Sequence, residues 1–345
     1  MSQTERVKRA NQKEMIKTPY HLFLGCGDNE LSIKTSRGIA EFNPDVCIGE
    51  IAGGDSPLTV GLDKLSIKEA ASKGAKTFVI GLANAGGYVE PEWEPYIIEA
   101  IENGMDIASG LHRKLEEFPA ILEAAEKHGV ELHNVRHGYT DLKTGTGEKR
   151  TGKRLLAVGS DCSVGKMYTT VAITNEMKKQ GFDVEFKATG QTGVLVAGSG
   201  ICIDAVVADF IAGGIEELSP SNDENHWDII EGQGSLYNPA FAGVSLGLLH
   251  GSQADVIVFC HEAGRPHIKG LPHMPMPDMT DCIELNLKHA RLTNPNATLG
   301  GISLNCRNLS AEEGEKQRAE LAEKYGVPCF DPMITGVSEF VETLK

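Results

Sequence analysis

Short hydrophobic runs alternate with amphipathic segments along the first half of this chain. Runs that end near a glycine predict buried parallel strands at 19–24, 46–49, 77–80 and 106–108. Segments with apolar residues at helical spacing predict helices at 66–73, 93–103 and 118–128. Strands that alternate with helices in this way pack as an open sheet covered by helices. Residues 1–150 are therefore expected to form a Rossmann-like α/β domain with an open sheet.

The second half follows a polar stretch, residues 142–154, which reads LKTGTGEKRTGKR and predicts a solvated linker. Further buried strands are expected at 155–158, 183–186, 227–230, 255–260 and 299–304. Helices are expected at 279–291 and 311–325, and another is expected to carry Asp204 and Asp209. The alternation predicts a second α/β domain with a parallel sheet over residues 151–345.

The segment 158–170, VGSDCSVGKMYTT, joins a predicted strand to a predicted helix through a Gly-rich turn. This is the context of a phosphate-binding P-loop, in which backbone N–H groups, the helix dipole and a lysine converge on an anion. The second domain is therefore expected to be of the P-loop NTPase type. The residues expected to bind the phosphates of a cofactor are Ser160, Asp161, Cys162, Ser163, Val164, Gly165, Lys166 and Met167.

The loop departs from the standard pattern at Met167, where a serine or threonine hydroxyl normally holds Mg²⁺ beside a triphosphate. A thioether cannot replace that hydroxyl, so we expect phosphate binding without metal-assisted bond breaking. His261, His267 and His273 recur at intervals of six residues, which is not the spacing of metal ligands on a helix. The motifs therefore predict no metal site.

The composition limits the classes of molecule that this protein is expected to bind. The 345 residues include 48 acidic and 33 basic side chains, for a formal net charge of -15, and no basic block stands out. Nucleic acid and anionic membranes are therefore excluded as expected partners, and small molecules remain. Eight scattered cysteines, an N-terminal segment without an apolar signal core and the lack of a membrane-length run predict a cytoplasmic protein. Two broad α/β domains favour a homo-oligomer.

Four segments of the second half resemble dethiobiotin synthetase and its relatives in order and spacing. These segments are GSDCSVGK, residues 185–190 (EFKATG), residues 230–234 (IEGQG) and residues 304–307 (LNCR). The resemblance covers residues 154–345. It places Lys187 where those enzymes face their substrate, Glu231 where they hold Mg²⁺, and Asn305 where they read the nucleotide base.

The whole chain resembles a two-domain P-loop family whose best-assigned member is a D-glutamate N-acetyltransferase. The stretches GSDCSVGKMYTT, TGQTG, IEGQGSL and ADVIVFCHEAGR are typical of that family. The resemblance implies transfer of acetyl from acetyl-CoA to the amine of D-glutamate or a related amino acid. The CoA phosphates would lie in the P-loop. The lack of a metal-binding hydroxyl at Met167 would then not impair the reaction. The alternatives are an ATP- and Mg²⁺-dependent ligase or kinase of the dethiobiotin synthetase type, and a nucleotide-binding regulator without turnover.

Acyl transfer needs a base, oxyanion donors and cations for the substrate carboxylates. The residues considered for proton transfer and catalysis are Glu231, Asp161, His261 and Lys187. Those expected to bind the substrate are Lys187, Thr189, Gln191 and Arg265, while Asn305 and Arg307 are expected to reach the adenine or its phosphate. Structural alternatives stay open: Lys187 pairs with Asp161 or Glu231, Asp161 caps loop N–H groups, Arg265 pairs with a nearby acid, or His261 is a hydrogen-bonded strand-end residue.

Overall fold

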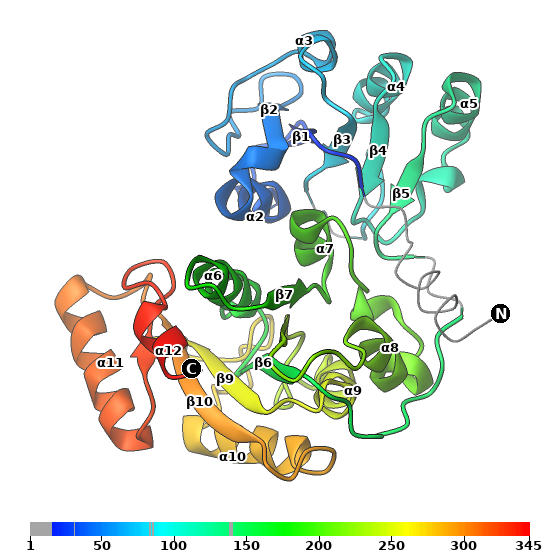
Figure 1. Cartoon of the computed structure of the whole chain (residues 1–345). Helices are drawn as coiled ribbons and strands as arrows, with labels where there is room; N and C mark the ends of the chain where they lie inside the picture. The colour runs from blue at the N-terminus through cyan, green and yellow to red at the C-terminus, as the bar shows by residue number, and fades with distance from the viewer. Residues whose placement is uncertain (1–15, 31, 83, 85, 138–140) are drawn as a thin grey trace. The chain divides into compact units, whose positions relative to one another are not determined.

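The computed structural model describes residues 16–30, 32–82, 84, 86–137 and 141–345. Its contacts divide the chain into two compact units. Unit 1 holds the chain through Thr140 together with Gln191–Cys202, and unit 2 holds Asp141–Gly190 and Ile203–Lys345. Each unit is built around one parallel sheet (Figure 1). The predicted fold class is therefore confirmed.

Unit 1 has a five-stranded sheet in the order β2-β1-β3-β4-β5. Its strands are β1 (Tyr20–Phe23), β2 (Cys47–Ile51), β3 (Thr77–Ile80), β4 (Asp106–Ser109) and β5 (Leu132–Asn134). Its helices are α2 (Lys34–Phe42), α3 (Ile67–Ser72), α4 (Glu94–Glu102), α5 (Pro119–His128) and α7 (Gln191–Ala197). The helices α3, α4 and α5 lie on one face of the sheet, and α2 and α7 on the other (Figure 1). All residues of β1, β3 and β4 are buried, as strands covered on both faces require.

Unit 2 has a six-stranded sheet in the order β11-β10-β9-β6-β8-β7. Its strands are β6 (Lys153–Gly159), β7 (Val184–Lys187), β8 (Trp227–Ile230), β9 (Val256–Glu262), β10 (Thr298–Asn305) and β11 (Cys329–Phe330). Its helices are α6 (Lys166–Lys179), α8 (Ile211–Leu218), α9 (Ala242–Ser252), α10 (Met279–Ala290), α11 (Ala311–Tyr325) and α12 (Ser338–Glu342). The helices α8, α9 and α10 pack together on one face, and α6 contacts α12 on the other (Figure 1). The strand β6, which leads into the P-loop, lies inside the sheet between β8 and β9.

Strongly patterned segments were predicted to within a residue or two. The strands β3 and β8 and the helix α11 have the predicted bounds, and α11 begins with a capping box between Ser310 and Glu313. The short strand β5 and the helices α2, α7 and α9 were not predicted. The Gly/Thr-rich stretch TGQTG by itself predicts a turn, yet α7 begins at Gln191 within it.

Two local predictions were wrong. Asp204 and Asp209 do not share an α-helix; they lie in separate 3₁₀ turns, Ile203–Ala205 and Ala208–Phe210, before α8 begins. The stretch 142–154 is not solvated throughout, because β6 begins at Lys153 and the side chains of Arg150 and Arg154 are buried. The Arg154 guanidinium donates to Ser219 Oγ at 2.8 Å and to the carbonyl of Pro220 at 2.9 Å.

Within the described ranges, every helix is too short or too polar to cross a bilayer.

Candidate phosphate-binding site

The P-loop of unit 2 is shaped by left-handed backbone at its tip. Gly165 adopts φ +109°, which glycine reaches without steric cost, and Ser163 adopts φ +55°. A side chain at Gly159 would place its Cβ 2.8 Å from Val164 Cγ2 and 3.0 Å from the carbonyl of Cys260. The glycines therefore let the loop double back onto the sheet edge, and α6 begins directly after the loop at Lys166.

Lys166 lies over this loop with most of its side chain buried. Its ammonium donates to the backbone carbonyl of Asp161 at 2.8 Å, and burial lowers the pKa of that ammonium. The stem passes against Gly232, where an added Cβ would lie 2.9 Å from Lys166 Cδ and 1.7 Å from the carbonyl of Ala157. The glycine of the IEGQG segment thus leaves room for the lysine that an anion would contact.

Asp161 anchors the loop through its side chain. The carboxylate is fully buried and accepts hydrogen bonds from Asn238 Nδ2 at 3.0 Å, Arg265 Nη1 at 2.9 Å and the Lys269 N–H at 2.6 Å. Burial acts to raise the pKa of this carboxyl, but the bonds from Asn238, Lys269, Cys162 and Arg265 together lower it. Asp161 is therefore held ionised and has little capacity to take a proton at neutral pH.

Arg265 also contacts the P-loop. Its guanidinium donates to the carbonyls of Cys162 at 2.8 Å and Ser163 at 3.0 Å, and it forms an ion pair with Glu262. Lys269 Nζ donates to Ser163 Oγ at 2.8 Å. Arg265 and Lys269 together bind the loop from the segment that follows β9, and we call this pair the loop clasp. These contacts correspond to the alternative in which Arg265 pairs with a nearby acid.

Glu262 forms an ion pair with a second arginine at the same edge of the sheet. Arg307 Nη2 lies 2.7 Å from Glu262 Oε1, and its side chain is otherwise exposed to solvent. Asn305 Oδ1 accepts from the N–H of Arg307 at 3.2 Å, and Asn305 pairs with Glu262 in the register of β9 and β10. The structure thus brings Asn305 and Arg307 to the carboxyl edge that holds the loop clasp.

Glu231 follows β8 and is a predicted base whose carboxyl has a pKa near neutrality. Its Oε2 accepts from the N–H groups of Thr189 at 2.9 Å and Gly190 at 3.0 Å. Thr189 also donates through Oγ1 to the carbonyl of Glu231 at 2.6 Å. Burial raises the pKa of the Glu231 carboxyl to about 7. A carboxyl with such a pKa exchanges protons readily near pH 7.

His261 lies against the start of the P-loop. Its Nδ1 is 2.9 Å from Ser160 Oγ, and burial lowers the pKa of the imidazole. The ring is therefore neutral at pH 7. Ser160 is held from the other side as well, because Ser235 Oγ donates to its carbonyl at 2.9 Å. His261 thus contacts the phosphate loop and bears a lone pair or a proton toward Ser160.

The remaining loop residues contribute packing and backbone. Val164 is buried in a small cluster with Ala157 and Cys260. Cys162 Sγ lies 3.8 Å from Asn238 Nδ2. The carbonyl of Met167 accepts from Thr170 Oγ1 at 2.9 Å inside α6.

The Lys187 side chain is not brought to this site, and Gln191 belongs to unit 1. The Lys187 ammonium lies 2.7 Å from Glu185 Oε2 and 3.4 Å from Asp228 Oδ1, an adjacent pair one pleat earlier in β7 and β8. Its side chain therefore runs back along the strands, away from the edge that holds Glu231. Gln191 begins α7 of unit 1, where a Cβ on Gly110 would lie 2.1 Å from its Oε1.

Sequence reasoning missed Asn238, Ser235 and Lys269. All three lie in loops after strands of the unit 2 sheet, and no spacing relates them to the P-loop. Their position after a predicted strand was the signal available, since the carboxyl ends of parallel strands meet at one edge.

A parallel sheet whose inner strand enters a Gly-Lys loop and a helix defines a P-loop protein, and here that unit follows a Rossmann-like α/β unit. Residues 142–341 match the family described as "Domain of unknown function (DUF1611_C) P-loop domain". Residues 51–138 match its partner, the "(DUF1611_N) Rossmann-like domain". The chain belongs to this two-domain DUF1611 family.

Two relatives and one solved structure cover nearly the whole chain. A Pseudoalteromonas sp protein named D-glutamate N-acetyltransferase is 51% identical over 95% of this chain and 99% of its own. A Tritonibacter scottomollicae protein of the same name is 43% identical over 96% of this chain and 99% of its own. The crystal structure of a DUF1611 family protein from Anabaena variabilis superposes with a TM-score of 0.83 at 27% identity, covering 95% of this chain and all of that one.

Proposed function

We propose that this chain is a D-glutamate N-acetyltransferase that uses acetyl-CoA as the acetyl donor. The observation that carries the proposal is its similarity, end to end, to two relatives that bear this name. The P-loop chemistry supports the same conclusion, because CoA contains a pyrophosphate that needs binding and no metal-assisted cleavage.

In this proposal the CoA phosphates occupy the P-loop. Loop N–H groups and the start of α6 supply the positive end of a helix dipole, and Lys166 supplies an ammonium. Lys269 adds an exposed ammonium at the rim of the loop, next to Ser163. Met167 offers no hydroxyl for Mg²⁺, which agrees with a cofactor whose phosphate bonds stay intact.

Glu231 is proposed as the proton acceptor. The ammonium of the acceptor amino acid loses a proton, and its nitrogen attacks the thioester carbonyl. The C–N bond then forms, the C–S bond breaks and the CoA thiolate leaves, taking up the second proton that the nitrogen loses. A carboxyl with a pKa of about 7 matches the first of these proton transfers.

The length of CoA constrains this arrangement. About twelve bonds separate the pyrophosphate from the sulfur, which corresponds to roughly 14 Å when the arm is extended. Glu231 lies beside the lysine of the phosphate site, since Gly232 contacts the Lys166 stem. The P-loop can hold the phosphates and Glu231 can act as the base in the same complex if the pantetheine arm folds back over the loop. The kinetics of a Glu231 variant test this arrangement.

The direct experiment incubates the full chain with acetyl-CoA and either D- or L-glutamate and measures the release of free thiol. A parallel reaction with ATP and Mg²⁺ measures phosphate release. Thiol release that depends on D-glutamate supports the proposal. Phosphate release stimulated by an amino acid, without thiol release, would return the chain to the ligase class.

Lys166→Ala tests the phosphate site. We expect CoA to bind at least about tenfold more weakly, because the variant loses a charge-assisted contact to phosphate. Lys178→Ala, an exposed position on the same helix, is the matched control. Isothermal titration of both variants with CoA checks the result, and unchanged binding by Lys166→Ala would remove the P-loop from the mechanism.

We propose further that the protein is cytoplasmic. All eight cysteines are free, which suits a reducing cytoplasm. We also propose a homo-oligomer, for which light scattering on the purified protein is the measurement.

A further inference from the structure

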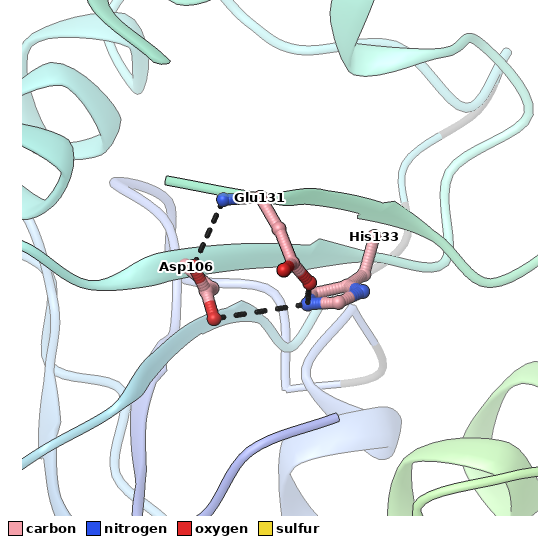
Figure 2. Close-up of side chains that lie close together, drawn as sticks. All are labelled: Asp106, Glu131 and His133. Atoms are coloured by element: carbon pink, nitrogen blue, oxygen red, sulfur yellow. Dashed lines mark hydrogen bonds and ion pairs between the residues drawn. The ribbon is translucent and has the colours of Figure 1, made fainter. Parts of the chain in front are cut away.

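A second cluster of chemistry-bearing side chains lies in unit 1, apart from the P-loop. Asp106 is the first residue of β4, and His133 lies in β5, directly after Glu131 and Leu132. The neighbouring strands β4 and β5 bring the three side chains together (Figure 2). Imidazole nitrogens and carboxylate oxygens together form the donor set of many first-row transition-metal sites.

The spacing of the donor atoms suits a metal ion. His133 Nε2 lies 3.4 Å from Glu131 Oε2 and 3.9 Å from Asp106 Oδ2, and one donor atom from each residue lies within 4.8 Å of the others (Figure 2). Tetrahedral ligands with bonds of about 2.0–2.1 Å are roughly 3.3 Å apart. The distance between His133 and Glu131 already agrees with this value, and Asp106 Oδ2 would have to move closer to the imidazole.

Two of these atoms, Glu131 Oε2 and His133 Nε2, are buried and make no hydrogen bond; they face each other at an ion-pair distance of 3.4 Å. Buried polar atoms in native proteins nearly always make a hydrogen bond, and one that does not calls for an explanation such as a bound ion. A cation between them would satisfy both atoms at once. Asp106 is already oriented for this, because its Oδ1 accepts from the N–H of Glu131 at 2.9 Å while Oδ2 faces the imidazole.

Lys17 provides the positive charge of this cluster in the structure. Its ammonium lies 3.0 Å from Asp106 Oδ2 and 3.5 Å from Glu131 Oε1. The side chains of Lys17 and Glu131 are 54% and 41% exposed. The Lys17 ammonium can therefore turn into solvent, which would leave the Asp106 and Glu131 carboxylates available to an ion. Lys17 and a metal ion would compete for the same carboxylates.

We propose that Asp106, Glu131 and His133 form a binding site for a divalent transition-metal ion of the Zn²⁺ class. The imidazole ligand disfavours Mg²⁺ and Ca²⁺, which prefer oxygen donors alone. The ion would tie β5, the edge strand of the sheet, to β4. It would stabilise unit 1, and the proposed acetyl transfer does not depend on it.

A similar cluster in unit 2 provides contrast. Glu185, His226 and Asp228 also bring donor atoms together, but the Lys187 ammonium lies between two of them and its side chain is only 11% exposed. A lysine held in that way cannot leave for solvent as Lys17 can. Among the residues that the structure describes, we therefore expect one Zn²⁺ site, in unit 1.

The test titrates the full chain, stripped with EDTA, with ZnCl₂ and separately with MgCl₂ by calorimetry, and records thermal unfolding with and without Zn²⁺. We expect one Zn²⁺ site, no Mg²⁺ binding there, and a rise in the unfolding temperature of unit 1. His133→Gln should weaken Zn²⁺ binding by about tenfold or more. Lys17→Gln should strengthen it several-fold, because the competing ammonium is gone.

Two controls keep the outcome clear. His128→Gln removes an exposed histidine of α5 outside the cluster and should leave Zn²⁺ binding unchanged. Lys17→Gln keeps all three ligands, so it reports on the site even if His133→Gln folds poorly. Absence of Zn²⁺ binding in both the natural chain and Lys17→Gln overturns the proposal, and so does binding that His133→Gln leaves intact. Either result would leave His133 as an ion-pair partner of Glu131.

Discussion

Individual residues of the P-loop edge divide into those that hold the loop and those that can exchange protons. Asp161 accepts hydrogen bonds from Asn238, Arg265 and Lys269 and stays ionised, whereas the buried Glu231 has a pKa raised to about 7. Both are buried carboxylates in one small region. Burial raises the pKa of both carboxyls. At Asp161 the hydrogen bonds, among them one from a guanidinium at 2.9 Å, outweigh burial, whereas at Glu231 two bonds from backbone N–H groups offset it only in part.

Glu231→Gln should lower kcat about a hundredfold or more while leaving KM for acetyl-CoA nearly unchanged, because it removes the proposed base. In the natural enzyme, kcat should fall as the pH drops below about 7, where the carboxyl becomes protonated. Steady-state kinetics between about pH 5.5 and about pH 9 measure both effects. A rise in KM with kcat intact would instead place Glu231 in the phosphate site.

The same variant should be more stable than the natural protein at pH 8. The folded pKa of Glu231 lies above the unfolded value, so the folded state holds a proton that the unfolded state has lost between about pH 4.5 and about pH 7. Stability therefore falls as the pH rises through that window. Glutamine carries no charge to bury, and we expect a gain on the order of 1–3 kcal/mol. Thermal unfolding at pH 5 and pH 8 checks the sign, and the gain should be present only at pH 8.

At the scale of elements, the segment after β9 holds the P-loop in its conformation. Arg265 contacts two buried carboxylates, those of Asp161 and Glu262, and two loop carbonyls, and Lys269 contacts Asp161 and Ser163. A P-loop presents its N–H groups to an anion only when its backbone is fixed. The loop clasp therefore prepares the anion site before any ligand binds.

Arg265→Ala should destabilise the protein by about 3–5 kcal/mol, because it leaves the buried Asp161 carboxylate without its cation. Asp161→Asn in the same chain should restore part of this loss, which a double-mutant cycle of thermal unfolding measures. The sequence prediction that Arg265 binds a substrate carboxylate gives a different result. It requires a large rise in KM for D-glutamate with unfolding unchanged.

At the scale of the whole molecule, the chain joins a P-loop unit to a Rossmann-like unit, and each unit has its own parallel sheet. The activity predicted from the sequence is the one that both full-length relatives carry in their names. The solved structure of a family member covers 95% of this chain with a TM-score of 0.83. The order of the two units is thus a property of the family.

Ligand stabilisation tests the proposed function on the intact protein. CoA at one hundred times its dissociation constant (~100 Kd) should add about 2.7 kcal/mol of stability, visible as a shift in thermal unfolding. Acetyl-CoA and CoA should stabilise the chain with or without EDTA. Stabilisation by Mg²⁺-ATP alone, abolished by EDTA, would contradict the acetyl-CoA assignment.

The sequence by itself determined the elements whose patterns are strong and local. The strands β3 and β8, the helix α11 and the P-loop were predicted because periodicity, caps and a Gly-Lys turn act within a few residues. The strand β5 and the helix α7 were not, since a three-residue strand and a Gly/Thr-rich helix start have no local signal that outweighs their neighbours.

Only the tertiary structure decided what the polar side chains do. The sequence placed Lys187 and Arg265 near substrate carboxylates, but the ion pairs with Glu185, Asp228, Asp161 and Glu262 come from strands and loops that folding brings together. The pKa of Glu231 is likewise set by burial, which no spacing reveals. The cluster of Asp106, Glu131 and His133 joins neighbouring strands. The sequence pattern determines helices and strands because the interactions that form them are local. The ion pairs and the pKa of a side chain depend instead on neighbours that are distant in the sequence.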